Sequence, residues 1–182
     1  QRFEKLLGTR RPISPSYHLQ FSEALSNFAL RCARPIVEAF DGRLIYSGGD
    51  DVLALLPADT ALDCARALRM AFQGDSGLAK FVQENAAHLK SANEAARRHV
   101  PYYQQLAAKL GLFECPTRGF LAREDLADQT ANRPIPFLVP GPAADCSVGI
   151  AIAHFKDPLQ DVVREAQAAE KRAKTQLGRS AV

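Results

Sequence analysis

Residues 43–57 read Arg-Leu-Ile-Tyr-Ser-Gly-Gly-Asp-Asp-Val-Leu-Ala-Leu-Leu-Pro, so that two apolar runs flank a Gly-Gly-Asp-Asp tetrapeptide. This pattern predicts a β-hairpin that carries Asp50 and Asp51 at its tip. Gly48 and Gly49 can adopt positive φ and leave room for the phosphates of a ligand, because glycine has no Cβ. Adjacent carboxylates suit Mg²⁺ or Mn²⁺, which take oxygen ligands and often substrate phosphates. The stretch therefore indicates nucleotidyl transfer under metal control.

An ordinary turn is the competing interpretation of the tetrapeptide, because Gly and Asp are among the commonest turn-forming residues. The flanking runs 44–46 and 52–56 are too apolar for surface loops, so they place the acidic pair on a sheet. Rigid elements hold metal ligands more accurately than loops do. The strand context therefore favours a metal site over a plain turn.

The bulk composition is that of one soluble globular domain. The chain has 182 residues, of which 47% are hydrophobic and 24% charged, and no apolar run reaches the roughly 20 residues that span a bilayer. We therefore expect no membrane partner. The net charge of +3 is too small to indicate nucleic-acid binding by itself. The four cysteines show no C-x₂-C pairing, which predicts reduced, mostly buried thiols in a cytoplasmic protein rather than a zinc site.

Start and stop signals predict the order helix, strand, turn, strand, helix in the first half of the chain. Ser14 is placed to cap a helix with Pro15 at its first position, and Pro35 interrupts this helix before it ends near Phe40. A second helix begins at Asp59 or Thr60 and stops at Gly74.

The second half of the chain gives weaker signals. We expect helices over about 76–110 and loops over 114–142, with a short helical turn at 121–126. A run of small and apolar residues predicts a buried strand at 146–153, and a final helix is expected over about 158–176.

Four pieces of the chain together resemble a known family. The chain resembles the palm domain of the large polymerase-like subunit of type III CRISPR interference complexes, most of all the Cmr type. The matching pieces are 13–18, 45–57, 147–156 and the last helix at 169–174, which is followed by 178–182. This resemblance implies an α+β palm, or ferredoxin-like nucleotidyl-cyclase fold, with an antiparallel sheet. We assign 1–74 and 133–182 to the palm and 75–132 to a helical and loop insertion.

The same resemblance implies a reaction. Members of this family convert ATP into cyclic oligoadenylates when the complex, with its guide RNA and other subunits, binds target RNA. Asp50 and Asp51 would hold Mg²⁺ or Mn²⁺ in a two-metal mechanism that activates a ribose 3′-hydroxyl. Gly48 and Gly49 would let the triphosphate lie against the backbone. Lys174 would neutralise its β- and γ-phosphates.

Two further residues, Ser14 and His18, fall within the family motif and are candidates to line an adenine pocket. Each has a structural alternative that we favour slightly: a helix cap for Ser14 and a packed histidine for His18. Lys174 has an alternative too, because it could belong to a solvated basic face at a helix end, where lysine is favoured electrostatically.

The chain departs from the family pattern at its start. The family palm has the order β-α-β-β-α-β, and its first strand carries another metal-binding aspartate. Residues 1–11 offer no apolar strand and no Asp. We therefore expect that the chain is cut from a larger protein just after that strand, lacks one metal ligand, and is inactive alone.

Two rival functions remain open. Diguanylate-type cyclases share the palm and use GTP, but typically carry Gly-Gly-Asp/Glu-Glu-Phe at the turn, where this chain has Asp51-Val52. The other rival is a non-catalytic scaffold that keeps the hairpin only to bind nucleotide or to hold the subunits and the guide RNA.

Overall fold

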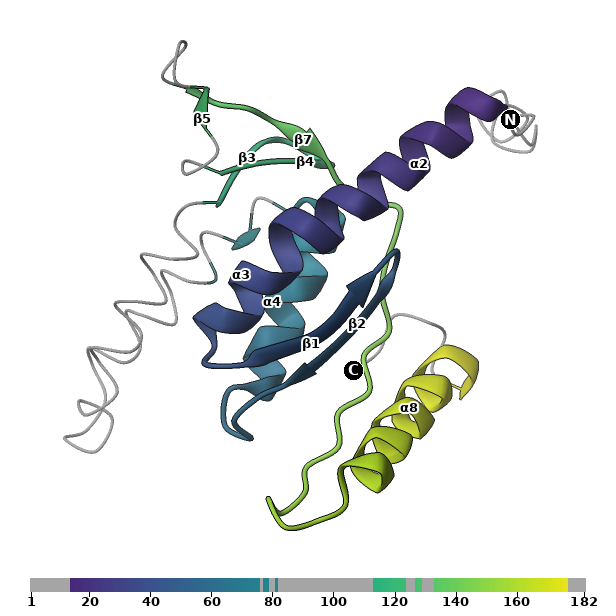
Figure 1. The fold of residues 1–182 in the computed structure, drawn as a ribbon. Coiled ribbons are helices and arrows are strands. Elements are labelled where there is room, and N and C mark those ends of the chain that lie inside the picture. Colours follow the sequence, from purple (N-terminus) through teal and green to yellow (C-terminus); the bar gives the residue numbers. More distant parts are fainter. Residues whose placement is uncertain are drawn as a thin grey trace, which may run out of the picture.

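The computed structural model describes residues 14–75, 77–78, 81, 113–123, 127–128 and 133–176. Helices and small antiparallel sheets make up this part of the chain, which confirms the α+β class (Figure 1). In chain order the elements are α2 (Pro15–Asn27), the π-helical segment η1 (Phe28–Ala33), α3 (Arg34–Ala39), β1 (Arg43–Gly48), β2 (Asp51–Leu55), α4 (Ala61–Gln73), β3 (Phe113–Thr117), β4 (Phe120–Arg123), β5 (Ala127–Asp128), β6 (Arg133–Pro134), β7 (Phe137–Leu138) and α8 (Leu159–Gln176).

The first helical run begins where the sequence predicts and changes its pitch before Pro35. The N–H of Tyr17 donates to the Ser14 Oγ at 3.2 Å, which confirms Ser14 as the N-cap of α2. Because Pro35 has no N–H, it cannot bond the carbonyl of Arg31 four residues earlier. The six residues of η1, just before Pro35, form the wider π-helical turns found at such interruptions.

The predicted hairpin is confirmed. Strands β1 and β2 pair antiparallel with Gly48 opposite Asp51, so Gly49 and Asp50 form a two-residue loop. Gly49 has a φ of 61°, a conformation that glycine adopts without strain. The register shifts between Leu44 and Tyr46, which marks a β-bulge.

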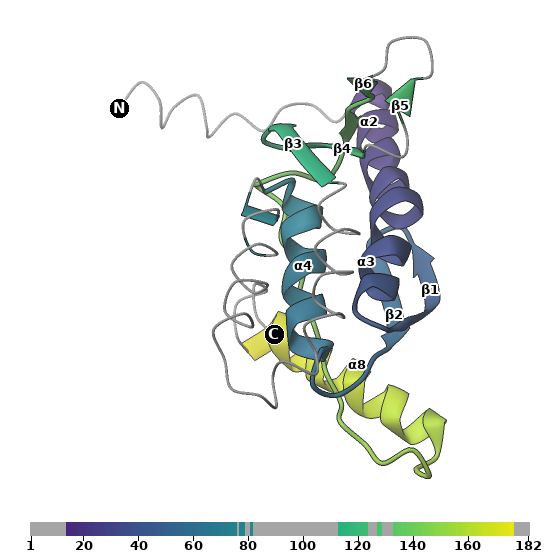
Figure 2. The same cartoon turned by 90° about the vertical axis from the view of Figure 1, so that its left-hand side faces the viewer.

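Helices cover one face of the hairpin (Figures 1 and 2), and the core lies between them. From the hairpin, Leu44, Val52 and Ala54 pack against the buried side chains of η1, α3 and α4. The rings of Phe28 and Phe72 meet edge to face with centroids 5.0 Å apart. The core cluster comprises Phe28, Cys32, Ile36, Val37, Ala39, Phe40, Cys64, Ala67, Ala71, Phe72, Leu78, Phe81, Leu121, Phe137 and Val139.

Two of the cysteines lie in this core as free thiols, as the sequence predicts. Burial raises the pKa of Cys32 and of Cys64 to about 12. Both thiols therefore stay neutral at physiological pH and act as small apolar side chains.

Helix α4 confirms both predicted ends, although its N-cap residue makes no capping hydrogen bond. Gly74 terminates it in the left-handed conformation, with a φ of 60°. We expected Asp59 or Thr60 to cap the start of the helix, and Thr60 does stand at the N-cap position. Its side chain, however, makes no capping hydrogen bond. Its hydroxyl lies 3.1 Å from the Phe40 carbonyl and 3.2 Å from that of Pro57, so it ties the helix to the preceding loop instead.

The loop predicted over 114–142 is wrong, because strands form there. β3, β4 and β7 make a three-stranded sheet, and the turn between β3 and β4 contains Gly119 at a φ of 84°. The helical turn predicted at 121–126 is also wrong, since residues 120–123 belong to β4. Leu121 and Phe137 face the core from this sheet, and their burial favours pairing over a loop.

The strand predicted at 146–153 is wrong as well. The hairpin forms a two-stranded sheet of its own, and the structure assigns no strand to residues 139–158. In Figure 1 this part of the chain runs as an extended segment between β2 and α8. Residues 144–151 are only half-buried, and Ile152, which follows them, is 75% exposed. Residues 146–153 have the composition of a strand. A strand forms, however, only where another strand lies alongside to accept its hydrogen bonds, and the composition of a segment does not determine this.

The final helix, α8, is confirmed, and its apolar side is half-buried around the fully buried Ala173. Most of the helices predicted over 76–110 lie outside the described residues, of which Gly77, Leu78 and Phe81 are helical. Among the described helices, none has the length and apolar character needed to cross a membrane.

Replacing Gly74 by Ala should lower the free energy of unfolding by about 3 kcal/mol, because the strain of a positive φ adds to a backbone clash. A Cβ on Gly74 would lie 2.8 Å from the N and Cα atoms of Gly119. Gly49→Ala is the matched control, since Gly49 has nearly the same φ but open space around it, and it should cost only about 1 kcal/mol. Urea denaturation of both variants measures the difference, and equal losses would contradict this packing.

Candidate functional site

The two candidate metal ligands lie at the exposed tip of the hairpin. Asp50 is in the loop and Asp51 opens β2, and both are solvent-exposed. The Ser47 hydroxyl, on the strand just before the tip, donates to the carbonyl of Ala29 in η1 at 3.4 Å. This contact fixes the tip to the helical layer and leaves the two carboxylates free to face outward.

The two glycines differ in their surroundings. A Cβ on Gly49 would meet no atom within 4 Å, so the backbone there is open to a ligand. A Cβ on Gly48 would collide with the hydroxyl of Tyr46 and lie 2.8 Å from its Cζ. The open backbone predicted for a phosphate is therefore present at Gly49, whereas the Tyr46 side chain covers Gly48.

Lys174, from the far end of the chain, joins this site. A hydrogen bond from its ammonium to Glu170 raises the pKa of Lys174, burial opposes this, and the charges of Glu170, Asp51 and Asp50 raise it further. The structure thus places Lys174 within electrostatic range of both tip carboxylates, and its side chain stays 47% exposed. Of the residues predicted for the site, Gly48, Gly49, Asp50 and Asp51 share the hairpin tip, and Lys174 on α8 is within electrostatic range of the two aspartates.

A close contact between α8 and the preceding extended segment sets the position of Lys174. A Cβ on Gly149 would collide with the Ala166 carbonyl and the Glu170 N–H, so the backbones touch at this point. Only glycine permits this approach. Ala173, next to Lys174, is 2% exposed and anchors the last turns of the helix.

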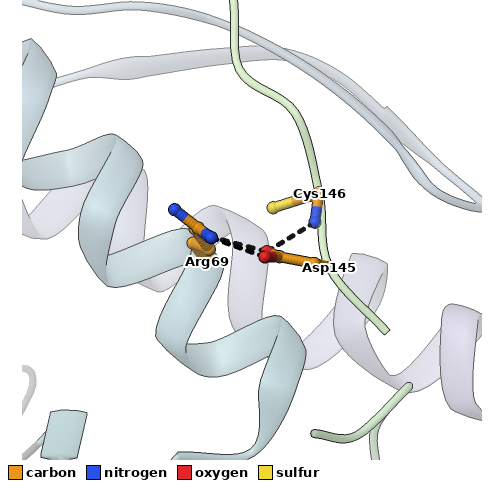
Figure 3. A network of polar contacts seen from close by, with 3 residues as sticks. All are labelled: Arg69, Asp145 and Cys146. Atoms are coloured by element: carbon orange, nitrogen blue, oxygen red, sulfur yellow. Dashed lines mark hydrogen bonds and ion pairs between the residues drawn. The ribbon is translucent and has the colours of Figure 1, made fainter. Parts of the chain in front are cut away.

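An ion pair holds the start of that segment to the helical layer (Figure 3). Arg69 on α4 donates two hydrogen bonds to the carboxylate of Asp145, one of them from Nε to Oδ1 at 2.6 Å. The same Oδ1 accepts the N–H of Cys146 at 2.8 Å. Burial, together with the charge of Asp145, raises the pKa of the Cys146 thiol to about 11. Because the pair is bidentate, it fixes both the distance and the orientation of the Asp145 carboxylate relative to the Arg69 guanidinium.

The remaining two candidates lie away from the tip. Ser14 caps α2, the structural role we favoured, and His18 lies on the exposed first turns of that helix. The His18 ring has the Tyr17 ring at 6.3 Å in an edge-on arrangement and is not packed as predicted. His18 precedes Ala29 by eleven residues, about 16 Å along a helix axis.

The described residues do not form a complete metal cage. Within 14–75, 77–78, 81, 113–123, 127–128 and 133–176, no three His, Cys, Asp or Glu side chains are grouped closely enough to hold an ion. Asp50 and Asp51 therefore stand as two carboxylates, which is the number that Mg²⁺ often takes from a protein when phosphates complete its shell.

Sequence reasoning missed Tyr46, Arg69 and Asp145. A one-residue bulge turns Tyr46 toward the glycines, and no residue type announced that bulge. The Arg69–Asp145 pair joins positions 76 apart in the sequence, and a lone Arg on a helix face gives no signal for such a partner.

The chain matches the model of the Cas10/Cmr2 second palm domain over residues 2–107. It belongs to this family, which confirms the resemblance that the sequence suggested. The match includes residues 75–107, which the motifs of the sequence did not align.

Two curated relatives are Cmr2 subunits. The chain is 49% identical to the CRISPR system Cmr subunit Cmr2 of Pyrococcus furiosus over 59 residues, which are 32% of this chain and 7% of that protein. It is 41% identical to the CRISPR system CMR subunit Cmr2 of Saccharolobus solfataricus over 64 residues, 35% of this chain and 6% of that protein. The matched part thus spans less than a tenth of either relative. No solved structure matches the chain.

The Arg69–Asp145 pair should contribute a coupling free energy of about 2 kcal/mol in a double-mutant cycle, because the pair is bidentate and partly desolvated. Its side chains are 31% and 21% exposed. The cycle uses Arg69→Met and Asp145→Asn and compares urea denaturation midpoints.

The Arg164–Asp161 pair on α8 is the control, since its side chains are 72% and 64% exposed. Its coupling should be about 0.3 kcal/mol. Equal coupling in the two cycles would contradict a structural role for Arg69–Asp145.

Proposed function

We propose that this chain is the palm portion of a type III CRISPR effector subunit that converts ATP into cyclic oligoadenylates by metal-dependent nucleotidyl transfer when target RNA binds. Membership in the Cas10/Cmr2 second palm family supports the class of protein. The observation that carries the proposal is the electrostatic coupling of Lys174 on α8 to Asp50 and Asp51 at the hairpin tip, which come from segments more than 120 positions apart.

These three side chains carry the kinds of charge that nucleotidyl transfer needs. Carboxylates bind divalent cations, and an ammonium nearby binds phosphate oxygens. The two kinds of group lie on separate elements, the hairpin and α8, so a triphosphate could extend from one to the other. A solvated basic face would not require Lys174 to lie within electrostatic range of the two tip aspartates, so this coupling favours the functional interpretation.

The residues at the tip fit Mg²⁺ or Mn²⁺. Asp50 and Asp51 are adjacent, exposed and oxygen-bearing, and a hard divalent cation bound by one or two carboxylates keeps room for phosphates. When bound, such cations would activate the ribose 3′-hydroxyl and stabilise charge at the attacked α-phosphate. The two-metal form of the mechanism rests on the family resemblance.

The backbone supplies the surface on which the triphosphate would lie. Gly49 holds a positive φ and has open space where a side chain would stand. Lys174 would neutralise the β- and γ-phosphates from α8, and it must exchange its contact with Glu170 for one with phosphate. Ser47 holds the loop in place through Ala29, so the carboxylates keep their position relative to the helical layer.

The partners follow from the relatives. Both curated relatives are named as subunits of a Cmr system, so other subunits, the guide RNA and the target RNA are the proposed partners of the intact protein. ATP is the proposed substrate. A non-catalytic nucleotide-binding scaffold is the alternative, and it is consistent with the absence of a third metal ligand among the described residues.

Replacing Asp50 and Asp51 together by Ala in the intact protein should abolish conversion of labelled ATP in the presence of target RNA and Mn²⁺, because the cations lose both carboxylate ligands. The loss should exceed about 100-fold, as expected when transition-state charge is no longer stabilised. Surviving product would make the carboxylates structural and support the scaffold. Labelled GTP is assayed in parallel, and a preference for GTP would support a diguanylate-type cyclase instead.

Replacing Lys174 by Ala should raise the KM for ATP by about tenfold, since one charge-assisted contact with phosphate is worth about 1.4 kcal/mol or more. Lys171→Ala is the matched control, because Lys171 is an exposed lysine one turn earlier on the same helix. Steady-state kinetics with ATP compares the two. A similar change in both variants would assign Lys174 to a general basic face.

A further inference from the structure

The bulge in β1 decides which side chains share a face with the candidate metal ligands. Arg43 and Leu44 lie opposite Leu55 and Ala54, but Tyr46 lies opposite Leu53, so Ile45 is the extra residue. Side chains alternate along a strand, and without the bulge Tyr46 would point to the same side as Leu44, toward the core.

With the bulge, the alternation is reversed for the last residues of β1. Ser47 points inward and bonds the Ala29 carbonyl, whereas Tyr46 and Gly48 point to the face away from the helices. Asp51, which is opposite Gly48, lies on this outer face too. Tyr46 is 56% exposed there, so core packing does not account for its position.

The ring of Tyr46 lies directly over the backbone of Gly48. A Cβ on Gly48 would collide with the Tyr46 hydroxyl, lie 2.8 Å from its Cζ and lie 3.4 Å from its Cε2. Asp51 lies directly opposite Gly48 on β2, and opposed residues of paired strands have Cβ positions about 5 Å apart, so the hydroxyl covers the position next to Asp51 on the same face. A phenol hydroxyl is both a donor and an acceptor of hydrogen bonds.

We propose that Tyr46 is a nucleotide-binding residue whose hydroxyl donates a hydrogen bond to a ribose or phosphate oxygen of the nucleotide held at the Gly48–Asp51 edge. This inference rests on the proposed function, since it assigns a further contact to the same site. The bulge places the Tyr46 hydroxyl over Gly48, which has no side chain of its own. A ligand at this position therefore gains a polar contact without meeting a Cβ on Gly48.

The test measures binding of Mg²⁺ and a non-hydrolysable ATP analogue to the intact protein by calorimetry. Tyr46→Phe removes only the hydroxyl and should weaken binding about five-fold, the worth of one hydrogen bond. Tyr46→Ala should weaken it at least as much. Tighter binding by Tyr46→Ala would overturn the proposal, because the ring would then be a cover that the nucleotide displaces.

Tyr17→Phe is the matched control, since Tyr17 is also 56% exposed but lies on α2, and its affinity should not change. Tripolyphosphate and adenosine show whether the oxygen belongs to a phosphate or to the ribose. If Tyr46→Phe weakens the binding of tripolyphosphate, the hydrogen bond goes to phosphate; if it weakens the binding of adenosine, the bond goes to ribose. An unchanged affinity of Tyr46→Phe for all three ligands would refute the contact.

The outcomes separate this inference from the proposed function. If the wild-type protein binds the analogue and Asp50→Ala/Asp51→Ala does not, but Tyr46→Phe binds like the wild type, the Tyr46 contact alone is refuted. If the wild-type protein does not bind the analogue, the proposed function fails and the contact fails with it.

Discussion

The carbonyl of Arg31 has no α-helical partner, because the residue four positions later is Pro35, which carries no N–H. The helix widens around this point into η1, and the Arg123 guanidinium on β4 donates to that carbonyl at 2.6 Å. In the same wide segment, the carbonyl of Ala29 accepts the hydroxyl of Ser47 on β1. The helical segment before this proline therefore accepts hydrogen bonds from both the β3–β4–β7 sheet, through Arg123, and the hairpin, through Ser47. The position of the Gly-Gly-Asp-Asp tip relative to the core follows from this arrangement.

The parts of the fold that sequence could predict are those with signals close together in the chain. Ser14 and Pro15 mark the start of α2, Gly74 ends α4, and the hairpin follows from two apolar runs around a glycine pair. Each signal acts through bonds within a few residues, so no knowledge of distant segments is needed. The parts that failed depend on partners. The segment at 146–153 has the composition of a strand but packs on α8, and β4 pairs with β7 although the intervening residues suggested only loops.

The residues of the candidate site also fall into two groups, those that the local sequence identifies and those whose position depends on distant contacts. Asp50 and Asp51 could be identified from the tetrapeptide itself, because chemistry and turn geometry coincide there. Lys174 entered through a family resemblance, and its place beside them depends on Gly149 and the Arg69–Asp145 pair, which no local pattern announces. Tyr46 depends on a bulge of one residue, which reverses the side-chain alternation that sequence reasoning assumes. Ser14 and His18 carried the family motif but lie on the projecting end of α2, so a motif match did not bring them to the tip.

The charges around the tip constrain what it can accept. Asp50, Asp51 and Glu170 set three carboxylates against the single ammonium of Lys174. A triphosphate adds further negative charge, so these four side chains by themselves would repel it. Divalent cations between the carboxylates and the phosphates would reverse the balance, and they would also free Lys174 from carboxylates that now share its charge. Nucleotide binding at this tip should therefore require the cation in a catalyst and in a nucleotide-binding scaffold alike. It is turnover, and not the metal requirement, that separates these two functions.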